Sequence, residues 1–193
     1  MRKGKKKWTI AATAATFIFT KNKNSSQTER KKDMRRSERE VTDQAEIAAI
    51  LQRTQVLHLG LNNGDYPYVV PVNFGFTLED GALTLFFHGA GEGTKQALLE
   101  RDPRVAFQLD CGHQLMPSEN DEGCYSSYAY ESVMGTGVAK EADESEKEEL
   151  LTQLLTHYGI TGKTFDPHIL AVTKVYKIKA EQYTAKRRMN DRG

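Results

Sequence analysis

The chain has 193 residues, with 27 basic and 26 acidic side chains and a formal net charge of +1 at pH 7. This length suits one domain with a substantial core, and the balanced charge excludes a strongly basic surface for nucleic acid or acidic lipid. The two cysteines, Cys111 and Cys124, do not make a disulfide framework, and no Cys or His pair has zinc-site spacing. We therefore expect a cytoplasmic protein with free thiols and with no metal, nucleic-acid or membrane partner.

Residues 1–33 differ in composition from the rest of the chain. They begin with a basic segment, continue with a short apolar run from Trp8 to Phe19, and then become polar and lysine-rich. The run is too short and too rich in threonine for a membrane span, which needs about 20 apolar residues. As a secretory signal it would be a poor one, because no clear cleavage site precedes the lysines. We expect a disordered or atypical extension at 1–33, one domain at 34–187 and a flexible tail at 188–193.

The first predicted elements are a helix and a strand. In VTDQAEIAAILQR, Asp43 is expected to cap the helix and Glu46 to complete a capping box. The apolar face of this helix consists of Ile47, Ile50 and Leu51. QVLHLGL predicts a strand, and Asn63-Gly64 predicts a tight hairpin turn after it.

The next run, YPYVVPVNFGF, predicts a single strand over residues 66–76 with alternating faces. One face carries Val70, Val72, Phe74 and Phe76, and the other carries Val69, Pro71, Asn73 and Gly75. Because proline cannot donate a ladder hydrogen bond, we expect a bulge or a sheet edge at Pro71. LEDG predicts a second turn, and ALTLFFH predicts a third strand.

Two helices and three strands complete the order. TKQALLE predicts about two helical turns, and RVAFQLD predicts a strand with Val105, Phe107 and Leu109 facing inward. Residues 111–124 are expected to form a polar loop. YSSYAYESVMGTGVAKE predicts a long strand with a bend or bulge at Gly135 and Gly137.

ESEKEELLTQLLTHYG predicts an amphipathic helix that ends at Gly159, and VTKVYKIKAEQYTAK predicts the last strand. Hairpin connections imply antiparallel pairing. We therefore expect a mainly β fold, in which a twisted antiparallel sheet closes into a barrel with helices around it.

The segment FFHGAGEGTKQALLE, residues 86–100, places three alternate glycines between a strand and a helix. It lacks the Gly-Lys-Ser/Thr of a Walker loop. It also departs from the dinucleotide fingerprint, because the third glycine is misplaced and no further βαβ unit follows. The segment fits a single phosphate monoester held by Lys95, the Thr94 hydroxyl and free N–H groups at the helix start. An ordinary turn with a solvated Lys95 explains the loop alone equally well.

Two nearby polar residues favour the phosphate interpretation. Asn73 lies on the face opposite the apolar stripe of its strand, and His88 directly precedes the glycine loop. A few polar groups beside an apolar barrel suit a planar heteroaromatic ligand, because the polar groups orient it while apolar atoms bury it.

Four segments together resemble the flavin-binding split-barrel family, the pyridoxamine 5'-phosphate oxidase-like group, and within it the nitroimidazole-resistance branch. They are LGLNNGDYPYVVPVNFGF, LFFHGAGEGTKQALLERDPRVAFQLD, SYAYESVMGTGVAKE and VYKIKAEQYTAK, and the resemblance covers about residues 34–187. It implies a six-stranded antiparallel split β-barrel and a homodimer with FMN at the interface.

The resemblance also implies roles for particular residues. The strand that flanks the isoalloxazine ring would be Val70, Pro71, Val72, Asn73 and Phe74. The ring and ribityl chain would be lined by His88, Gly89 and Ala90, and the phosphate would be held by Gly93, Thr94 and Lys95. A second strand, expected from the other subunit, would bring Tyr130, Ser132 and Val133. Two departures are Gly91, where many relatives carry a larger residue, and Arg187-Arg188, which do not reproduce the arginine motif of vitamin B6 oxidation.

The leading hypothesis is an FMN-dependent oxidoreductase that takes electrons from a reduced nicotinamide carrier and reduces small aromatic or nitro compounds. His88 is the candidate proton donor, because imidazole exchanges protons near neutral pH. The alternatives are a flavin, deazaflavin or haem module without efficient turnover, and a structural dimer with a degenerate site. Histidines for haem are present at His58, His88, His113, His157 and His168, but none lies in a haem-attachment motif.

Overall fold

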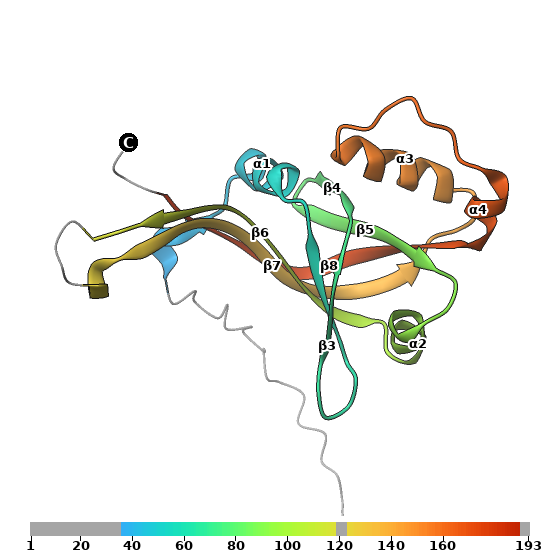
Figure 1. Ribbon diagram of the computed structural model, residues 1–193, viewed down its shortest axis with the longest axis horizontal. Helices are drawn as coiled ribbons and strands as arrows, with labels where there is room; N and C mark the ends of the chain where they lie inside the picture. Colours follow the sequence, from blue (N-terminus) through green and yellow to red (C-terminus); the bar gives the residue numbers. More distant parts are fainter. Residues whose placement is uncertain (1–35, 119–122, 190–193) are drawn as a thin grey trace, which may run out of the picture. The chain divides into compact units, whose positions relative to one another are not determined.

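The computed structural model describes residues 36–118 and 123–189, and Figure 1 shows their elements. The expected extension at 1–33 lies outside the described residues, as does most of the expected tail, although Arg188 still belongs to the last strand. The helical elements are η1 (Ser37–Arg39), α1 (Gln44–Arg53), α2 (Thr94–Arg101), η2 (Gly123–Tyr125), α3 (Lys147–His157) and α4 (Pro167–Val172). The strands are β1 (Glu40–Val41), β2 (Leu57–Leu61), β3 (Tyr68–Val72), β4 (Gly75–Glu79), β5 (Ala82–Ala90), β6 (Arg104–Met116), β7 (Ser127–Glu141) and β8 (Thr173–Arg188).

The strands of the described residues form one antiparallel sheet in the order β3-β2-β6-β7-β8-β5-β4, with β1 paired to β8. The two strands at the ends of this path, β3 and β4, are separated in sequence by Asn73 and Phe74 alone. Such a short connection holds the two edges of the sheet near each other at this corner, so the sheet curls into a barrel. The predicted mainly β, antiparallel split-barrel fold is confirmed.

The main correction to the predicted fold is the number of strands, which is eight in the described residues rather than six. The run over residues 66–76 is two strands on opposite edges of the sheet, since the chain leaves β3 after Val72 and enters β4 at Gly75. The two-residue strand β1 accounts for the other addition. Pro71 lies on the edge strand β3, as its missing N–H predicts.

The interior of the barrel is apolar, as the alternation predicts. The side chains of Val105, Phe107 and Leu109 on β6 are at most 4% exposed. They join a core that also includes Leu57, Leu59, Leu83, Leu85, Phe87, Val133 and Ile178. On β3, Val70 and Val72 pack against this core while Val69 and Pro71 face outward. No helix among the described residues is long and apolar enough to cross a membrane.

The turns follow the sequence in part. Asp80 and Gly81, at φ 49° and 82°, connect β4 to β5 as the predicted tight hairpin. The turn at Asn63-Gly64 is instead part of a six-residue connection, residues 62–67, although Gly64 does adopt a positive φ of 74°.

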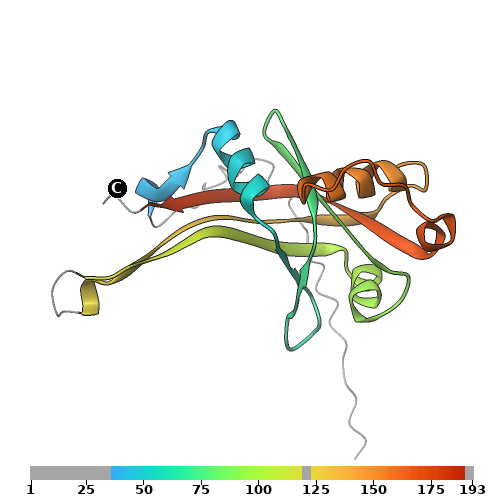
Figure 2. The same ribbon diagram turned by 45° about the horizontal axis from the view of Figure 1, so that its top comes forward.

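Residues 111–124 are not simply a polar loop. Strand β6 continues to Met116 and pairs with β7 up to Ser127, with a register shift between Cys111 and Gln114. The predicted irregularity near Gly135 and Gly137 is confirmed, because the pairing of β7 with β8 shifts between Thr136 and Gly137. The β6–β7 hairpin is the long two-stranded ribbon on the left of Figures 1 and 2.

Helix α1 begins where Asp43 predicts, since the Asp43 carboxylate accepts a hydrogen bond from the Glu46 N–H at 2.9 Å. The Glu46 carboxylate does not complete a capping box but accepts a hydrogen bond from Arg187 on β8. Helix α3 packs on β4 and β5 and is followed by Gly159 at φ 75°, as expected. Helix α4, capped by Asp166, was not predicted, and its last residue, Val172, was expected to begin the final strand.

Candidate cofactor site

The glycine loop connects β5 to α2, and its backbone is open to an anion. Gly93 has a φ of 128°, a conformation that side chains with a Cβ rarely adopt. The first hydrogen bond of α2 runs from the Ala97 N–H to the Gly93 carbonyl. The N–H groups of residues 94–96 therefore lie before the helical ladder, where they can donate to a negatively charged ligand.

Lys95 folds back over the end of β5 instead of extending into solvent. Its Nζ lies 3.4 Å from the His88 carbonyl oxygen, to which it donates, and 5.1 Å from the centroid of the Phe87 ring. A Cβ on Gly89 would lie 2.7 Å from this Nζ, so the glycine makes room for the lysine. Burial lowers the pKa of Lys95, and none of the ion pairs between described residues includes it. A partly buried cation without a carboxylate partner suits an anionic ligand.

Gln96 also belongs to this loop, although it was not among the predicted site residues. It is 5% exposed, and its Nε2 donates a hydrogen bond to the Ala90 carbonyl oxygen. This bond ties the first turn of α2 to the last residue of β5 and so fixes the width of the loop. Its spacing could have indicated that it is buried, because Gln96 lies three residues before Leu99 and so shares the buried face of α2.

His88 and Asn73 lie at the same end of β5. His88 pairs in the ladder with Val175 of β8, and Asn73 is exposed two residues before the Gly75–Phe86 pair. Although His88 is an exposed residue, partial burial of its ring lowers its pKa, and the nearby charge of Lys95 lowers it further. The proton-donating role of His88 stays a prediction.

The predicted ring-binding strands present their side chains to two different faces. Pro71 is exposed on the outer face of the sheet, as are Val69 beside it and Asn73 beyond it. The side chains of Val70, Val72, Phe74 and Val133 face or belong to the core. These four positions can meet an outer ligand through their backbone alone.

Tyr130 and Ser132 of β7 lie far from the glycine loop within one chain. Ser132 is opposite Lys186 of β8, whereas Gly89 is opposite Lys174 of the same strand. The separation of twelve positions between these lysines spans about 40 Å of strand at about 3.3 Å per residue. Figure 1 accordingly shows α2 near one end of β8, whereas the β6–β7 hairpin extends away from α2 toward the other end. One chain does not bring the two parts of the predicted site together.

The outer face of the sheet carries a groove of about 680 Å³ between β3 and β8, with a mostly apolar lining. Val69 and Met134 in its lining are 62% and 50% exposed. The other lining residues are His58, Gly60, Ala106, Phe107, Gln108, Gly135, Thr136, Gln182, Tyr183 and Thr184. The Nδ1 atom of His58 is buried without a hydrogen-bond partner in the described part of the chain.

Residues 43–187 match the family model described as pyridoxamine 5'-phosphate oxidase. The chain belongs to this family. A comparison with curated proteins found no match. The predicted resemblance to this family and the predicted split-barrel fold are therefore confirmed.

Several solved structures are similar to this member of the family. A proposed 5-nitroimidazole antibiotic resistance protein from Bacteroides thetaiotaomicron is 29% identical with a TM-score of 0.65, and the match covers 77% of this chain and 86% of that one. The flavocytochrome Anf3 from Azotobacter vinelandii is 21% identical with a TM-score of 0.66, covering 81% and 72%. The FAD and heme binding protein from Mycobacterium smegmatis is 17% identical with a TM-score of 0.68, covering 79% and 74%. The last two similarities concern the fold.

One of the two adjacent C-terminal arginines of this family member, Arg187, is engaged within the fold. Arg187 donates to the carboxylates of Glu131 at 2.6 Å and Glu46 at 3.0 Å. It is therefore part of a structural network, and the expectation that the chain does not oxidise vitamin B6 stays a prediction. Among the described residues, no group of three or more His, Cys, Asp or Glu side chains is arranged to hold a metal ion.

Proposed function

We propose that the protein is a cytoplasmic, homodimeric FMN-dependent oxidoreductase that reduces small aromatic or nitro compounds with electrons from a reduced nicotinamide. The observation that carries this proposal is the partly buried Lys95, which has no carboxylate partner within residues 36–118 and 123–189 and lies beside the free N–H groups of α2. In a member of the pyridoxamine 5'-phosphate oxidase family, this arrangement suits the terminal phosphate of FMN.

The loop supplies three kinds of contact to a phosphate monoester. Lys95 gives a full positive charge, Thr94 gives a hydroxyl donor, and the helix start gives oriented N–H groups. Gly89 leaves the room that the Lys95 side chain occupies, and Gly93, at a φ of 128°, gives the loop a backbone conformation that other residues rarely adopt. His88 and Ala90 would then lie beside the ribityl chain and the edge of the ring.

A second copy of the chain completes the proposed site. Tyr130 and Ser132 lie about 40 Å along β8 from the loop, so they would meet the cofactor held by a partner. A two-fold interface repeats the same surface on both subunits, and the apolar groove with the exposed side chains of Val69 and Met134 offers such a surface. We expect sedimentation to give twice the chain mass and Met134→Asp to lower it to that of the monomer. A wild-type monomer at micromolar concentration would overturn the dimer.

When bound, FMN would supply the two-electron chemistry. The residues of this chain would bind its phosphate, orient its ring against the outer face and exclude water from one side. The nitro substrate is supported by the 29% identity with the proposed 5-nitroimidazole resistance protein.

The test is a titration of the purified protein with FMN, followed by absorbance and flavin fluorescence. Lys95→Ala should weaken binding roughly tenfold to hundredfold, because a charge-assisted hydrogen bond contributes about 1.5–3 kcal/mol. Lys163→Ala removes the same charge from an exposed loop and should leave the affinity unchanged. Wild-type protein that does not bind FMN, or a Lys95→Ala variant with unchanged affinity for FMN, would contradict the proposed role of Lys95 in binding the phosphate. A Soret band in the purified protein would point to haem, and bound FMN without turnover of nicotinamide and a nitroaromatic would point to a binding module.

A further inference from the structure

A β-bulge on β6 redirects one histidine toward the outer face of the sheet. Cys111 is opposite Glu131 and Gln114 is opposite Ala129, so two residues of β6, Gly112 and His113, face the single residue Tyr130. Gly112 has a φ of 68°, which is the conformation of the first residue in a glycine-type bulge. Bulges change the direction of a side chain relative to simple alternation, and this one brings His113 to the face that carries Asp110.

Asp110 and His113 form a hydrogen-bonded pair on that face. The Nε2 atom of His113 lies 2.5 Å from the Asp110 carboxylate, and the other carboxylate oxygen accepts a hydrogen bond from Gln108 at 2.5 Å. The ring centroid of His113 lies 6.0 Å from that of Tyr128. The carboxylate engages Nε2, which leaves Nδ1 for a ligand. Because the side chain is 45% exposed, it can regain a proton from water.

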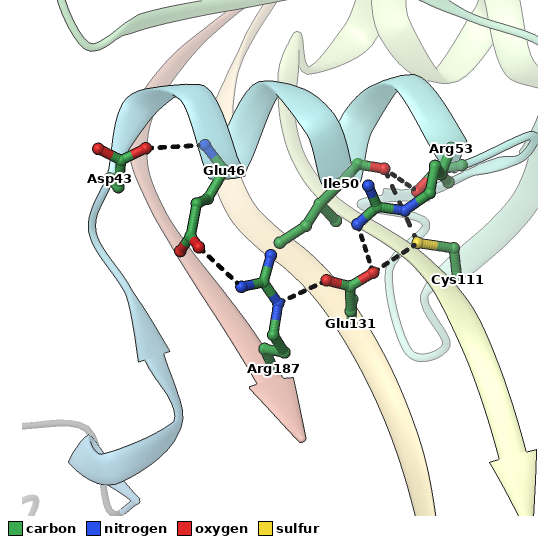
Figure 3. Close-up of polar contacts among 8 residues, drawn as sticks. Asp43, Glu46, Ile50, Arg53, Cys111, Glu131 and Arg187 are labelled. Carbon is green, nitrogen blue, oxygen red and sulfur yellow. Dashed lines mark hydrogen bonds and ion pairs between the residues drawn. The ribbon is translucent and has the colours of Figure 1, made fainter. Parts of the chain in front are cut away.

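The opposite face of the same strands carries a network centred on the buried Glu131, shown in Figure 3. The Glu131 carboxylate accepts hydrogen bonds from Arg53 of α1 at 2.5 Å and from Arg187 of β8 at 2.6 Å. The thiol of Cys111 lies 3.8 Å from the same carboxylate, and a Cβ on Gly112 would lie 3.4 Å from it. The bulge therefore rests on a fixed support, which holds the pair above it in one place.

The pair opens into a pocket of about 430 Å³ that contains the two outward-facing residues predicted to contact the cofactor, Tyr130 and Ser132. This pocket shares Gln108 and Met134 with the apolar groove of about 680 Å³. The outer face thus offers an apolar surface for a planar ring, and next to it a polar end with an oriented imidazole.

We propose that His113, oriented by Asp110, donates the proton that the nitro substrate needs when it is reduced at the interface with a second copy. This inference rests on the proposed function. The nitro group takes a hydride from the reduced flavin and a proton from His113, one N–O bond breaks, and water leaves (ArNO₂ + H⁻ + H⁺ → ArNO + H₂O). The imidazole then regains its proton from solvent.

His88 is less suited to this step. It lies next to Lys95 at the phosphate end of the proposed site, whereas His113 lies beside Tyr130 and Ser132. Burial and the charge of Lys95 both disfavour the protonated form of His88 by lowering its pKa. His113 instead has the Asp110 carboxylate to hold its ring in a fixed orientation beside the pocket.

The experiment compares His113→Ala with His168→Ala, a change of an exposed histidine on α4. Protein loaded with FMN is reduced anaerobically with dithionite and mixed with 2-nitroimidazole, and flavin reoxidation is followed in a single turnover. We expect His113→Ala to keep its FMN affinity within about twofold and to lose about a hundredfold in reoxidation rate, the usual contribution of a positioned proton donor. Added imidazole should restore part of the rate, and His168→Ala should behave as the wild type.

A second readout does not depend on turnover. The NMR signals of the His113 ring should move when 2-nitroimidazole is added to the oxidised, FMN-loaded wild type, and the His168 signals should not. Normal FMN affinity with an unchanged reoxidation rate in His113→Ala would overturn the assignment of His113 and leave the proposed function standing. Wild-type protein that does not bind FMN would overturn both.

Discussion

The loop at residues 88–96 and the strand region around Asp110, His113, Glu131 and Arg187 differ in how they are built. The loop is contiguous in sequence, and its parts touch one another through local contacts such as those of Lys95 with His88 and of Gln96 with Ala90. The strand region is assembled by sheet register from α1, β6, β7 and β8.

They also differ in how their charges are balanced. Glu131 is buried between two arginines, so its charge is matched inside the fold. Lys95 is partly buried with carbonyl and ring contacts but without a carboxylate among the ion pairs of the described chain. A buried charge that is paired within the protein is part of the folded structure. A buried charge without a partner lowers the stability of the fold unless a ligand supplies the opposite charge. Changes in the strand region should therefore lower stability, and changes in the loop should mainly lower ligand affinity.

The largest loss of stability is expected for Gly135→Ala on β7. A Cβ there would collide with the Gln182 carbonyl oxygen and the Phe107 ring, and the backbone of β8 cannot move aside as a flexible side chain can. We expect a loss of about 3 kcal/mol in the free energy of unfolding, at the upper end of the usual cost of overpacking. Urea denaturation followed by circular dichroism measures it. A loss below about 1 kcal/mol would show that β7 and β8 separate easily at this crossing.

Glu131→Ala should lower the free energy of unfolding by about 2 kcal/mol. The cost stays below that of a fully buried broken pair, because the Arg53 side chain is 50% exposed and can be hydrated, and because Arg187 keeps its contact with Glu46. Glu131→Gln, which keeps the shape and loses the charge, is the matched control and should cost less. Equal stability of the alanine variant and the wild type would mean that the network does not support the bulge.

The environment of Glu131 also predicts that the free energy of unfolding depends on pH. Burial alone would raise the pKa of Glu131, but hydrogen bonds and charges from Arg53 and Arg187 together outweigh it, so the pKa lies below its ordinary value of 4.5. The stabilisation is therefore present above about pH 4.5 and is lost as the pH falls through the lower pKa of the folded state. We expect the stability difference between the wild type and Glu131→Gln to shrink below pH 4.5.

The sequence predicted the loop better than the strand region, and the physical reason is locality. Gly89, Gly93 and Lys95 act within a few residues of one another, so their spacing carried the phosphate hypothesis. The pairing of Asp110 with His113 depends on a bulge, and the sequence gives Gly112 no sign that distinguishes it from a loop glycine. Because residues 111–124 were expected to form a loop, the bulge at Gly112 and His113 was not predicted.

The same reason explains the other differences. Arg53, Glu131 and Arg187 are distant in sequence, and only the register of β7 with β8 and the position of α1 bring them together. The alternation of residues 66–76 continues through Asn73 and Phe74, so periodicity could not reveal that the chain moves from β3 to β4 there. Periodicity reports which face is buried, but not which strand is the neighbour.

Gly89→Ala tests the loop side of the comparison. The added Cβ would meet the ends of the Lys95 and Gln96 side chains. The lysine is flexible and the glutamine must shift only slightly, so the fold should tolerate the change with a loss of about 0.5–1 kcal/mol in the free energy of unfolding. Because the lysine must leave its place, the FMN dissociation constant should rise several-fold to roughly tenfold. Titration and urea denaturation of the same preparation separate the two effects. A large loss of stability with unchanged FMN affinity would show that Gly89 is a structural residue, and that the loop contributes to stability rather than to ligand binding.

The smallest expected effect is electrostatic and concerns His88. Burial of the ring and the charge of Lys95 both lower its pKa, so Lys95→Met should raise it part of the way toward its ordinary value while the contribution of burial remains. The His88 ring signals, followed by NMR across the neutral pH range, measure the change, and Lys163→Met should leave them unaltered. If the phosphate of FMN binds at Lys95, its negative charge offsets that of the lysine, so adding FMN to the wild type should move the pKa of His88 in the same direction. A pKa that rises in Lys95→Met but not with FMN would place the phosphate somewhere other than the glycine loop.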